Sequence, residues 1–407
     1  MREFHVVVVD DEPHVMEGIC QSLQSAARQL GLALRTEGAS SATDALSRLS
    51  VRPADALVVD YRLQGGMSGA ELIERLPDPF ERLFIRLVSG QEEDELEPTV
   101  IGRQRVMGNR FRFLKKPVTP LQWKTEVLAL AAHVEAQPYP HLMALTLARV
   151  SQPESQFGRL KAVQDALETA LKHVTLFIAA DLIQRGVQIT GGASRGFKQQ
   201  LTLAPWLHCA DLLAQQYRID GQALCAGLAD AIRSSRKGLV AALHAMKSVR
   251  DSEIAHGYLG EEAGFELRAN EGSDRLERVM EGLRPLKDFE WLVQERVALP
   301  QEETDVFEYE VVRLGTSSDL FPRVRWRSRQ RLASGHVIVL ARDGRTLDLH
   351  PFFAWQTCEQ CRRRRLFMLD NWHEQSATFV YRAECNHLLS NAALTSAMTT
   401  ANAKLFG

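Results

Sequence analysis

Carboxylates stand at the ends of two short runs of β-forming residues in the first part of the chain. His5 to Val9 leads into Asp10 and Asp11, and Leu57 to Val59 leads into Asp60. Strands that alternate with helices predict a parallel sheet, and ligand sites of such sheets lie beyond the carboxyl ends of the strands. We therefore expect these three carboxylates to converge at one edge of a sheet.

A hydroxyl and an ammonium are expected at the same edge. Leu83 to Val88 leads to Ser89, and Phe111 to Leu114 leads to Lys116 by way of a second lysine. Both runs have the length and composition of buried strands. Three acids, one hydroxyl and one lysine at one sheet edge predict a site for magnesium and a phosphoryl group.

The chemistry gives each of these side chains a role. A carboxylate accepts a phosphoryl group only when its own charge and that of the incoming phosphate are neutralised, and Mg²⁺ does this through hard oxygen ligands. Asp10 and Asp11 would hold the ion, and Asp60 would be the nucleophile. Ser89 and Lys116 would bind the phosphoryl oxygens.

Five short motifs follow one another along residues 1–135: Asp-Asp-Glu at 10–12, Asp60 with Tyr-Arg-Leu at 61–63, Gly-Met-Ser-Gly at 66–69, Ser-Gly at 89–90 and Lys-Pro at 116–117. Together they resemble the receiver domain of two-component response regulators. The resemblance implies a doubly wound α/β domain with a five-stranded parallel sheet, phosphorylated on Asp60 with Mg²⁺ by a sensor histidine kinase or a phosphotransfer protein. It also implies that the backbone carbonyl of Arg62 is a third magnesium ligand and that the aromatic ring of Phe113 moves with phosphorylation.

Two features depart from the family, because Gln64 stands where proline is common and 91–108 is a loose acidic stretch where the fourth helix is expected.

Composition bounds what the remaining two thirds of the chain can be. The chain has 407 residues, enough for two or three domains, with 45% hydrophobic and 25% charged residues as in ordinary globular proteins. A net charge of −2 gives no bulk attraction to nucleic acids or membranes. The longest apolar runs are too short to span a bilayer, and the N-terminus enters a strand without a signal peptide. We expect a cytoplasmic protein with no membrane partner.

A linker is expected at 136–156 and an all-α bundle at 157–298. Pro138 and Pro140 block helix continuation in the linker, and 151–155 is polar turn-forming sequence. Apolar residues then recur three or four positions apart, which predicts one buried helical stripe: Phe157, Leu160, Val163, Leu167, Leu171 and Val174. Helical patterns resume at Trp206 to Gln216, Leu224 to Ser234, Leu239 to Val249 and Asp274 to Arg296.

Within the expected bundle, Arg250 and His256 are six residues apart, close to two helical turns, so on one helix they share a face with Asp251 beside them. The pattern resembles the HEPN superfamily of helical bundles, whose ribonuclease members pair their motifs across a dimer. The resemblance implies a homodimer that cleaves RNA without metal, with His256 as proton acceptor and Arg250 stabilising the phosphorane. Two other interpretations stay open: a HEPN-like bundle used for dimerisation or ligand binding, and an unrelated bundle in which both residues cap a helix.

Alternating patterns replace helical ones in the last part of the chain, so 299–407 is expected to be a small β-rich module. It holds Cys358 and Cys361 in a Cys-x-x-Cys motif and, later, Cys385 and His387 in a Cys-x-His motif. Two such pairs across hairpins resemble a zinc ribbon, in which four ligands complete a tetrahedron around Zn²⁺. Arg362 stands where glycine usually follows the first pair. A ribbon that has lost its metal, and a coincidence of cysteines, stay as alternatives.

Two groups of arginines are concentrated in this module. One is the run 362–365, and the other alternates at 323, 325, 327, 329 and 331, which places its members on one face of a possible strand. They predict an RNA-contacting edge or, alternatively, a solvated edge strand that resists aggregation.

The patterns together predict a multidomain response regulator of a phosphorelay: a receiver, a HEPN-like bundle and a β-rich module with a possible zinc ribbon. Two functions are compatible with this order of domains. In the first, phosphorylation of Asp60 controls a metal-independent ribonuclease. In the second, the protein is a non-enzymatic signalling adaptor whose bundle dimerises and binds a protein or nucleotide partner.

Overall fold

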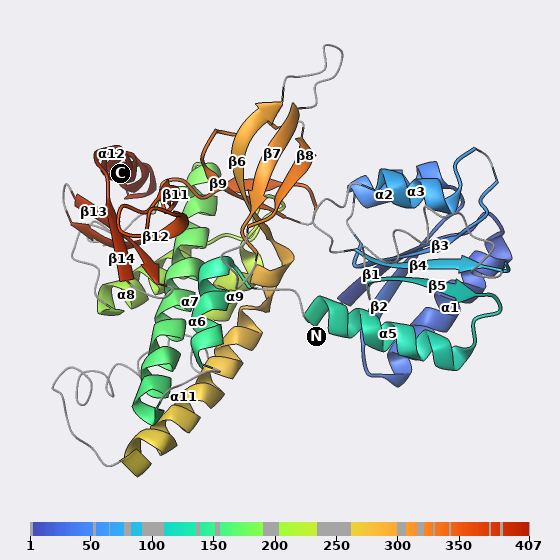
Figure 1. Cartoon of the computed structure of the whole chain (residues 1–407), viewed down its shortest axis with the longest axis horizontal. Helices are drawn as coiled ribbons and strands as arrows, with labels where there is room; N and C mark the ends of the chain where they lie inside the picture. The colour runs from blue at the N-terminus through green and yellow to red at the C-terminus, as the bar shows by residue number, and fades with distance from the viewer. Residues whose placement is uncertain are drawn as a thin grey trace. The chain divides into compact units, whose positions relative to one another are not determined.

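The computed structural model describes residues 3–406, except 52–53, 65, 77–82, 92–109, 136–138, 151–154, 190–202, 234–261, 299–306, 316–320, 329, 342, 374–375 and 383–385. The chain divides into two compact units with the boundary between residues 137 and 138. Figure 1 shows both units. None of the described helices is both long and apolar enough to cross a membrane.

The first unit is a five-stranded parallel sheet in the order β2-β1-β3-β4-β5. Its described elements are β1 (Glu3–Val9), α1 (Pro13–Gln29), β2 (Ala33–Ala39), α2 (Ala42–Val51), β3 (Ala56–Asp60), α3 (Gly69–Arg75), β4 (Phe84–Ser89), β5 (Phe111–Lys115) and α5 (Pro120–Glu135). The strand order confirms the predicted receiver-type fold. Apart from Gln91, the stretch expected in place of the fourth helix lies outside the described residues.

Alternate residues of the strands pack into two separate hydrophobic cores, one on each face of the sheet. Val7 and Val9 of β1 pack with α2 and α3, whereas Val6 and Val8 pack with α1 and α5. Figure 1 shows the two pairs of helices on opposite sides of the sheet. Because both faces are covered, β1 is apolar along nearly its whole length, as its run of four valines predicts.

The second unit combines helices with two antiparallel sheets. Its helices are α6 (His141–Val150), α7 (Gln156–Gln184), α8 (Leu203–Gln216), α9 (Ala226–Arg233), α11 (Glu262–Gly282), the 3₁₀ helix η5 (Arg284–Asp288) and α12 (Ala392–Phe406). Its strands are β6 (Glu290–Ala298), β7 (Phe307–Arg313), β8 (Arg323–Ser328), β9 (Val337–Leu340), β10 (Thr346–Asp348), β11 (Phe353–Thr357), β12 (Arg364–His373), β13 (Ser376–Arg382) and β14 (Asn386–Ser390). The sheets have the orders β10-β9-β6-β7-β8 and β11-β12-β13-β14. A helical region followed by antiparallel sheets agrees with the expected order.

Helix α7 is the centre of this unit. It is 29 residues long, and 20 of them are buried, so it is apolar around most of its circumference rather than along one stripe. Figure 1 shows α6 and α11 running along it. Lys172, almost fully buried on α7, joins the helix to β12: its Nζ lies 2.6 Å from Asp370 Oδ1 and 2.6 Å from Glu168 Oε1.

The structure places three boundaries differently from the sequence analysis. Helix α6 lies inside the expected linker at 136–156, and β6 lies inside the expected bundle at 157–298. The helix expected from Asp274 to Arg296 ends at Gly282, because Pro285 follows and the next residues pair with β7 and β9 as a central strand. The expected bundle and the expected β module share one buried core and form one unit.

Candidate functional site

The predicted phosphoryl site lies where four parallel strands of the first unit end. β1 leads to Asp10, β3 ends at Asp60, β4 ends at Ser89 and β5 leads to Lys116. The strand register aligns these ends, because Asp60 pairs with Val88 and Ser89 pairs with the last residue of β5. These four residues therefore lie at the same edge of the sheet.

Lys116 joins the two carboxylates. Its Nζ lies 2.9 Å from Asp10 Oδ2 and 2.6 Å from Asp60 Oδ1. The side chain of Asp10 is 2% exposed and that of Asp60 is 11% exposed, so the two charges lie mostly out of water. In such surroundings an ion pair is stronger than at the surface, which holds the lysine over both acids.

Backbone amides fix the orientation of each acid. The amide of Glu12 donates to Asp10 Oδ1 over 3.0 Å, and the amide of Arg62 donates to Asp60 Oδ2 over 2.8 Å. The hydroxyl of Ser89 accepts a hydrogen bond from the amide of Gln91 over 3.1 Å. In both Asp10 and Asp60, one carboxylate oxygen is bound by a backbone amide and the other lies next to Lys116 Nζ.

The electrostatics of the pair follow from burial and from the short contacts. Burial raises the pKa of Asp60, and the hydrogen bond from Lys116 offsets part of that rise. Burial alone would lower the pKa of Lys116, but its hydrogen bonds to Asp60 and Asp10 outweigh burial and raise it. The lysine is therefore a fixed positive charge beside the nucleophile.

The loop after β3 brings Gly69 against the backbone of Asp60. The amide of Gly69 donates to the carbonyl of Tyr61 over 3.1 Å, and a Cβ added at Gly69 would lie 2.0 Å from the carbonyl oxygen of Asp60. Ser68 and Glu71 form a capping box that starts α3 at this glycine. The sequence analysis recorded the glycine in a motif but did not find this role.

The oxygen atoms at this site are suitable ligands for a hard cation such as Mg²⁺. Asp10 and Asp60 both place an oxygen within 3 Å of one ammonium, so a cation at this position reaches both carboxylates. Asp11 follows directly and is partly exposed, and Arg62 lies beside the acceptor through its amide. Phe113 on β5 is partly buried against the core under α2 and α3.

Residues 6–127 match the family model of the response regulator receiver domain. This part of the chain is a receiver domain. Receiver domains generally use Mg²⁺ for phosphorylation and receive the phosphoryl group from histidine kinases or phosphotransfer proteins. The match covers less than a third of the chain, so it says nothing of the second unit.

Solved structures of receiver domains are similar to about a third of this chain. One is the receiver domain of the putative response regulator NarL from Mycobacterium tuberculosis, with 25% identity, 32% of this chain and 98% of that chain covered, and a TM-score of 0.26. Another is a receiver protein from Pseudomonas putida, with 28% identity, 32% and 98% covered, and a TM-score of 0.25. A third is the chemotaxis protein CheY4 from Vibrio cholerae, with 18% identity, 32% and 99% covered, and a TM-score of 0.25. A search of curated proteins gives no match.

The predicted ribonuclease residues Arg250, Asp251 and His256 lie outside the described residues. The prediction about them therefore still rests on the sequence.

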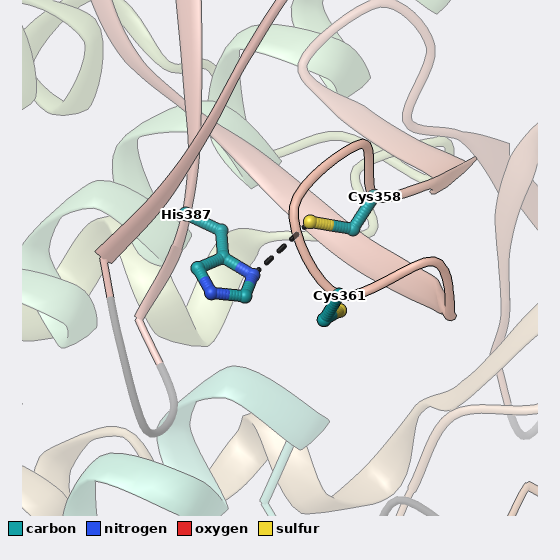
Figure 2. A group of neighbouring side chains, drawn as sticks. All are labelled: Cys358, Cys361 and His387. Atoms are coloured by element: carbon teal, nitrogen blue, oxygen red, sulfur yellow. Dashed lines mark hydrogen bonds between the residues drawn. The ribbon is translucent and has the colours of Figure 1, made fainter.

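Three of the four predicted zinc ligands come together in the second unit. The ligand atoms of Cys358, Cys361 and His387 all lie within 4.8 Å of one another. Figure 2 shows Cys358 and His387 facing one another with Cys361 beside them, and Cys358 Sγ lies 3.0 Å from His387 Nδ1. The fourth, Cys385, lies outside the described residues.

A tight turn between β11 and β12 presents the two cysteines. The amide of Arg362 donates to the carbonyl of Cys358 over 2.8 Å, and the amide of Cys358 donates to the carbonyl of Arg363 over 2.8 Å. Arg362 has φ of 57°, the left-handed conformation for which glycine is preferred. Zinc ribbons usually have glycine at this position, and here the turn forms with arginine.

The charges around the turn favour the thiolate form of Cys361. Burial would raise the pKa of this thiol, but hydrogen bonds from the amide of Arg363 and the guanidinium of Arg365, together with one from Cys358, lower it. Cys358 is 1% exposed and belongs to the core of the unit, whereas Cys361 is partly exposed. The pair thus has one sulfur in the core and one near the surface.

The two arginine groups of the sequence meet at one hollow. Arg323 of β8 lines a cavity of about 460 Å³ together with Arg363, Arg364 and Arg365. Glu295 of β6 lines the same cavity, and Arg323 Nε lies 3.0 Å from its Oε2. β8, which carries arginines of the alternating group, is an edge strand of its sheet.

Proposed function

We propose that the protein is a response regulator that accepts a phosphoryl group on Asp60 with Mg²⁺. The observation that supports this most directly is the position of Lys116 Nζ within 3 Å of both Asp10 and Asp60. A lysine held over two buried acids at the ends of parallel strands has a clear use when one acid receives an anionic group. The phosphoryl donor is a histidine kinase, a phosphotransfer protein or a small acyl phosphate.

The transfer follows from the geometry of the acids. An oxygen of Asp60 attacks phosphorus, a new O–P bond forms, and the bond from phosphorus to the donor breaks with its electron pair leaving on the donor. Asp10, Asp11, Asp60 and the Arg62 carbonyl would hold Mg²⁺, which would supply charge neutralisation when bound. The ammonium of Lys116 and the hydroxyl of Ser89 bind phosphoryl oxygens, and the amide of Arg62 keeps the acceptor carboxylate oriented.

Incubation with acetyl phosphate and Mg²⁺ tests the proposal by intact mass. The wild-type chain should gain one phosphate, and Asp60→Asn should gain none. Asp274→Asn, a change of the same chemistry on α11 of the second unit, should label like wild type. Chelation of Mg²⁺ should stop labelling. Labelling of Asp60→Asn at the wild-type rate would place the acceptor elsewhere.

We also propose that the second unit is the output and that its partner carries phosphate groups, as RNA does. The supporting observation is the hollow at which four arginines meet a single carboxylate, Glu295. Like charges gathered around a concave surface repel one another, and a bound polyanion relieves that repulsion. Arginine also binds phosphate through two parallel hydrogen bonds.

Aromatic residues line the same hollow. Phe321 and Trp355 pack edge to face with ring centroids 5.0 Å apart, and both line the cavity. Arginine and aromatic side chains together are typical of surfaces that bind single-stranded nucleic acid, where bases stack and the backbone is held by charge. This favours the RNA-contacting interpretation over the solvated edge strand.

Cleavage of that RNA is the further step that the sequence predicts. His256 would take the proton of a ribose 2′-hydroxyl and Arg250, with Asp251 beside it, would stabilise the phosphorane, across a homodimer. The alternative is an adaptor that binds its partner without cleaving it. Intact Arg250 and His256 favour the ribonuclease, and the net charge of −2 favours the adaptor.

Labelled single-stranded RNA separates binding from cleavage. In fluorescence anisotropy, the double variant Arg363→Gln, Arg364→Gln should bind RNA more weakly than wild type. Its binding constant should also depend less steeply on salt concentration, by the amount expected for the loss of about two phosphate contacts. Arg278→Gln on α11 should change neither the affinity nor its salt dependence. On a gel, wild type should give products ending in 2′,3′-cyclic phosphate and His256→Ala should give none. RNA that is bound but left intact, with and without phosphorylation, supports the adaptor; no binding by any form overturns the RNA proposal.

A further inference from the structure

We propose that Cys358, Cys361 and His387 bind a zinc ion that ties together two hairpins of the second unit. The site lies outside the receiver domain and does not depend on the phosphorylation of Asp60. The ligand atoms are mutually within 4.8 Å, and Figure 2 shows the three side chains grouped together. Zinc lies about 2.3 Å from sulfur and about 2.0 Å from nitrogen, so ligand atoms of one tetrahedron are roughly 3.3 to 3.8 Å apart. A sulfur and a nitrogen on one such ion are about 3.5 Å apart, so the 3.0 Å contact between Cys358 Sγ and His387 Nδ1 needs to open by about half an ångström.

The sheet brings together ligands that are far apart in the sequence. Cys358 follows β11 and His387 lies on β14, the two outer strands of the sheet β11-β12-β13-β14. The strands pair antiparallel throughout, so the β11–β12 and β13–β14 connections lie at the same end. A metal at this end therefore links two hairpins that the backbone ladder joins only through β12 and β13.

The turn at the first pair is built for two sulfurs. Two backbone hydrogen bonds close the segment from Cys358 to Arg363, so that both side chains face His387. Arg362 adopts a left-handed backbone conformation that is strained for any residue other than glycine. Metal coordination by the two cysteines supplies a reason for the chain to keep this conformation.

The donor set selects the kind of metal. Two thiolates and one imidazole are soft and borderline ligands, which suit zinc and do not suit Mg²⁺ or Ca²⁺. With a neutral imidazole the three ligands balance the charge of Zn²⁺. A further thiolate in the fourth position would leave one negative charge, and the buried Arg365 beside Cys361 would balance it.

The placement of Cys358 indicates a structural rather than a catalytic metal. Its side chain is 1% exposed and belongs to the core cluster that also contains residues of α7, β6 and α12. A substrate would not reach this sulfur. A zinc ion here holds the hairpin ends onto the shared core, and structural zinc adds folding free energy of that kind.

Elemental analysis of the full-length protein, purified in reductant without added metal and without a metal-binding tag, tests the proposal. Wild type should hold about one zinc per chain. Cys361→Ser and His387→Gln should lose most of it. Cys20→Ser, which changes a partly exposed thiol of the receiver domain, should keep it. Zinc retained at wild-type level by both ligand variants would overturn the proposal.

Cobalt keeps the test independent of whether a variant folds. Metal-free wild-type protein titrated with Co²⁺ should develop the visible bands of a tetrahedral ion and a sulfur-to-cobalt charge-transfer band, with an end point at one ion per chain, and Zn²⁺ should displace it. Wild-type protein that contains no zinc and takes up no cobalt, or that holds Cys358 and Cys361 as a disulfide under the same reducing conditions, would refute zinc binding.

Discussion

Gly69 is the residue beside the phosphoacceptor that tolerates least change. A Cβ there would lie 2.0 Å from the carbonyl oxygen of Asp60, and backbone cannot yield as a flexible side chain does. Gly69→Ala should therefore destabilise the receiver domain by about 1 to 3 kcal/mol, the usual cost of overpacking. It should also slow labelling of Asp60 by acetyl phosphate, since the loop that orients the acid must shift.

Gly18→Ala is the matched control for this prediction. Gly18 lies in α1, and an added Cβ there meets no atom within 4 Å. In a helix the change to alanine should stabilise by about 0.5 to 1 kcal/mol. Calorimetry of the full chain gives both stabilities, and the labelling rate gives the second readout. If Gly69→Ala has the melting temperature and the Asp60 labelling rate of wild type, the loop can move aside for the added Cβ and the prediction is wrong.

At the residue scale, the phosphoryl site could be predicted because its members share one rule, the convergence of parallel strand ends. That rule places Asp10, Asp60, Ser89 and Lys116 without any knowledge of contacts. The role of Gly69 could not be predicted, because it depends on how closely a loop returns to the strand it left. The buried ion pair between Arg86 of β4 and Glu126 of α5 could not be predicted for the same reason, because nothing in the local sequence shows that these two residues are in contact.

At the scale of elements, the buried helix α7 carries a histidine whose titration opposes folding. His173 is fully buried between Trp291 and Phe353, and its Nδ1 donates to the carbonyl of Thr169 over 2.9 Å. Its Nε2 has no hydrogen-bond partner among the described residues. Burial lowers its pKa to about 4; the bond to Thr169 opposes the shift, and neighbouring His141 adds to it.

The sign of the pH effect follows. The unfolded chain binds a proton at His173 near pH 6.5, whereas the folded chain does not until about pH 4. Lowering the pH through this window therefore stabilises the unfolded state, and the second unit should lose roughly 3 kcal/mol between those limits. Urea unfolding can be followed by tryptophan fluorescence, because five of the six tryptophans lie in the second unit: 206, 291, 326, 355 and 372.

His173→Asn removes the titration while keeping a donor for the Thr169 carbonyl. The loss of stability between pH 7 and pH 5 should be smaller in this variant than in wild type. His208→Asn on α8, where the side chain is exposed, should lose as much as wild type. An unchanged pH slope in His173→Asn would mean that another buried group causes the acid sensitivity.

The helical pattern from Phe157 to Val174 belongs to α7 and was predicted as helix, although α7 is buried over most of its surface. The strand β6 was not predicted as a strand. β6 was mistaken for helix because a central strand buried on both faces is apolar without strict alternation, and such a run is ambiguous between the two states. Its partners β7 and β9, which decide the matter, come later in the chain.

At the scale of the molecule, the receiver domain and the second unit have separate cores. The two clusters of the first unit contain only residues up to Val134, and the large cluster of the second begins at Leu142. Proline residues and a change of pattern mark this first boundary in the sequence. The sequence analysis did not predict that bundle and β module are one unit, because nothing local shows that α7 packs against residues two hundred positions later.

The division into two units predicts how fragments of the chain behave. Residues 1–137 should fold alone and accept phosphate on Asp60, and residues 138–407 should fold alone. Residues 299–407 should not. They lack β6, the central strand between β7 and β9, and they lack Trp291 and His173, against which the ring of Phe353 packs at centroid distances of 5.1 and 5.2 Å. Because a sheet without its middle strand leaves two edges and an uncovered apolar face, burial is too small to offset chain entropy.

Far-ultraviolet circular dichroism during heating distinguishes the three fragments. The two complete units should each show one cooperative transition, and 299–407 should show none, with or without zinc. Added zinc is the necessary control, because a metal that organised the hairpins on its own would rescue the short fragment. A cooperative transition in 299–407 would mean that the β module is an independent domain after all, attached to the helices by contacts it does not need. Failure to fold, together with folding of 138–407, would locate the stability of both sheets in their packing on α7.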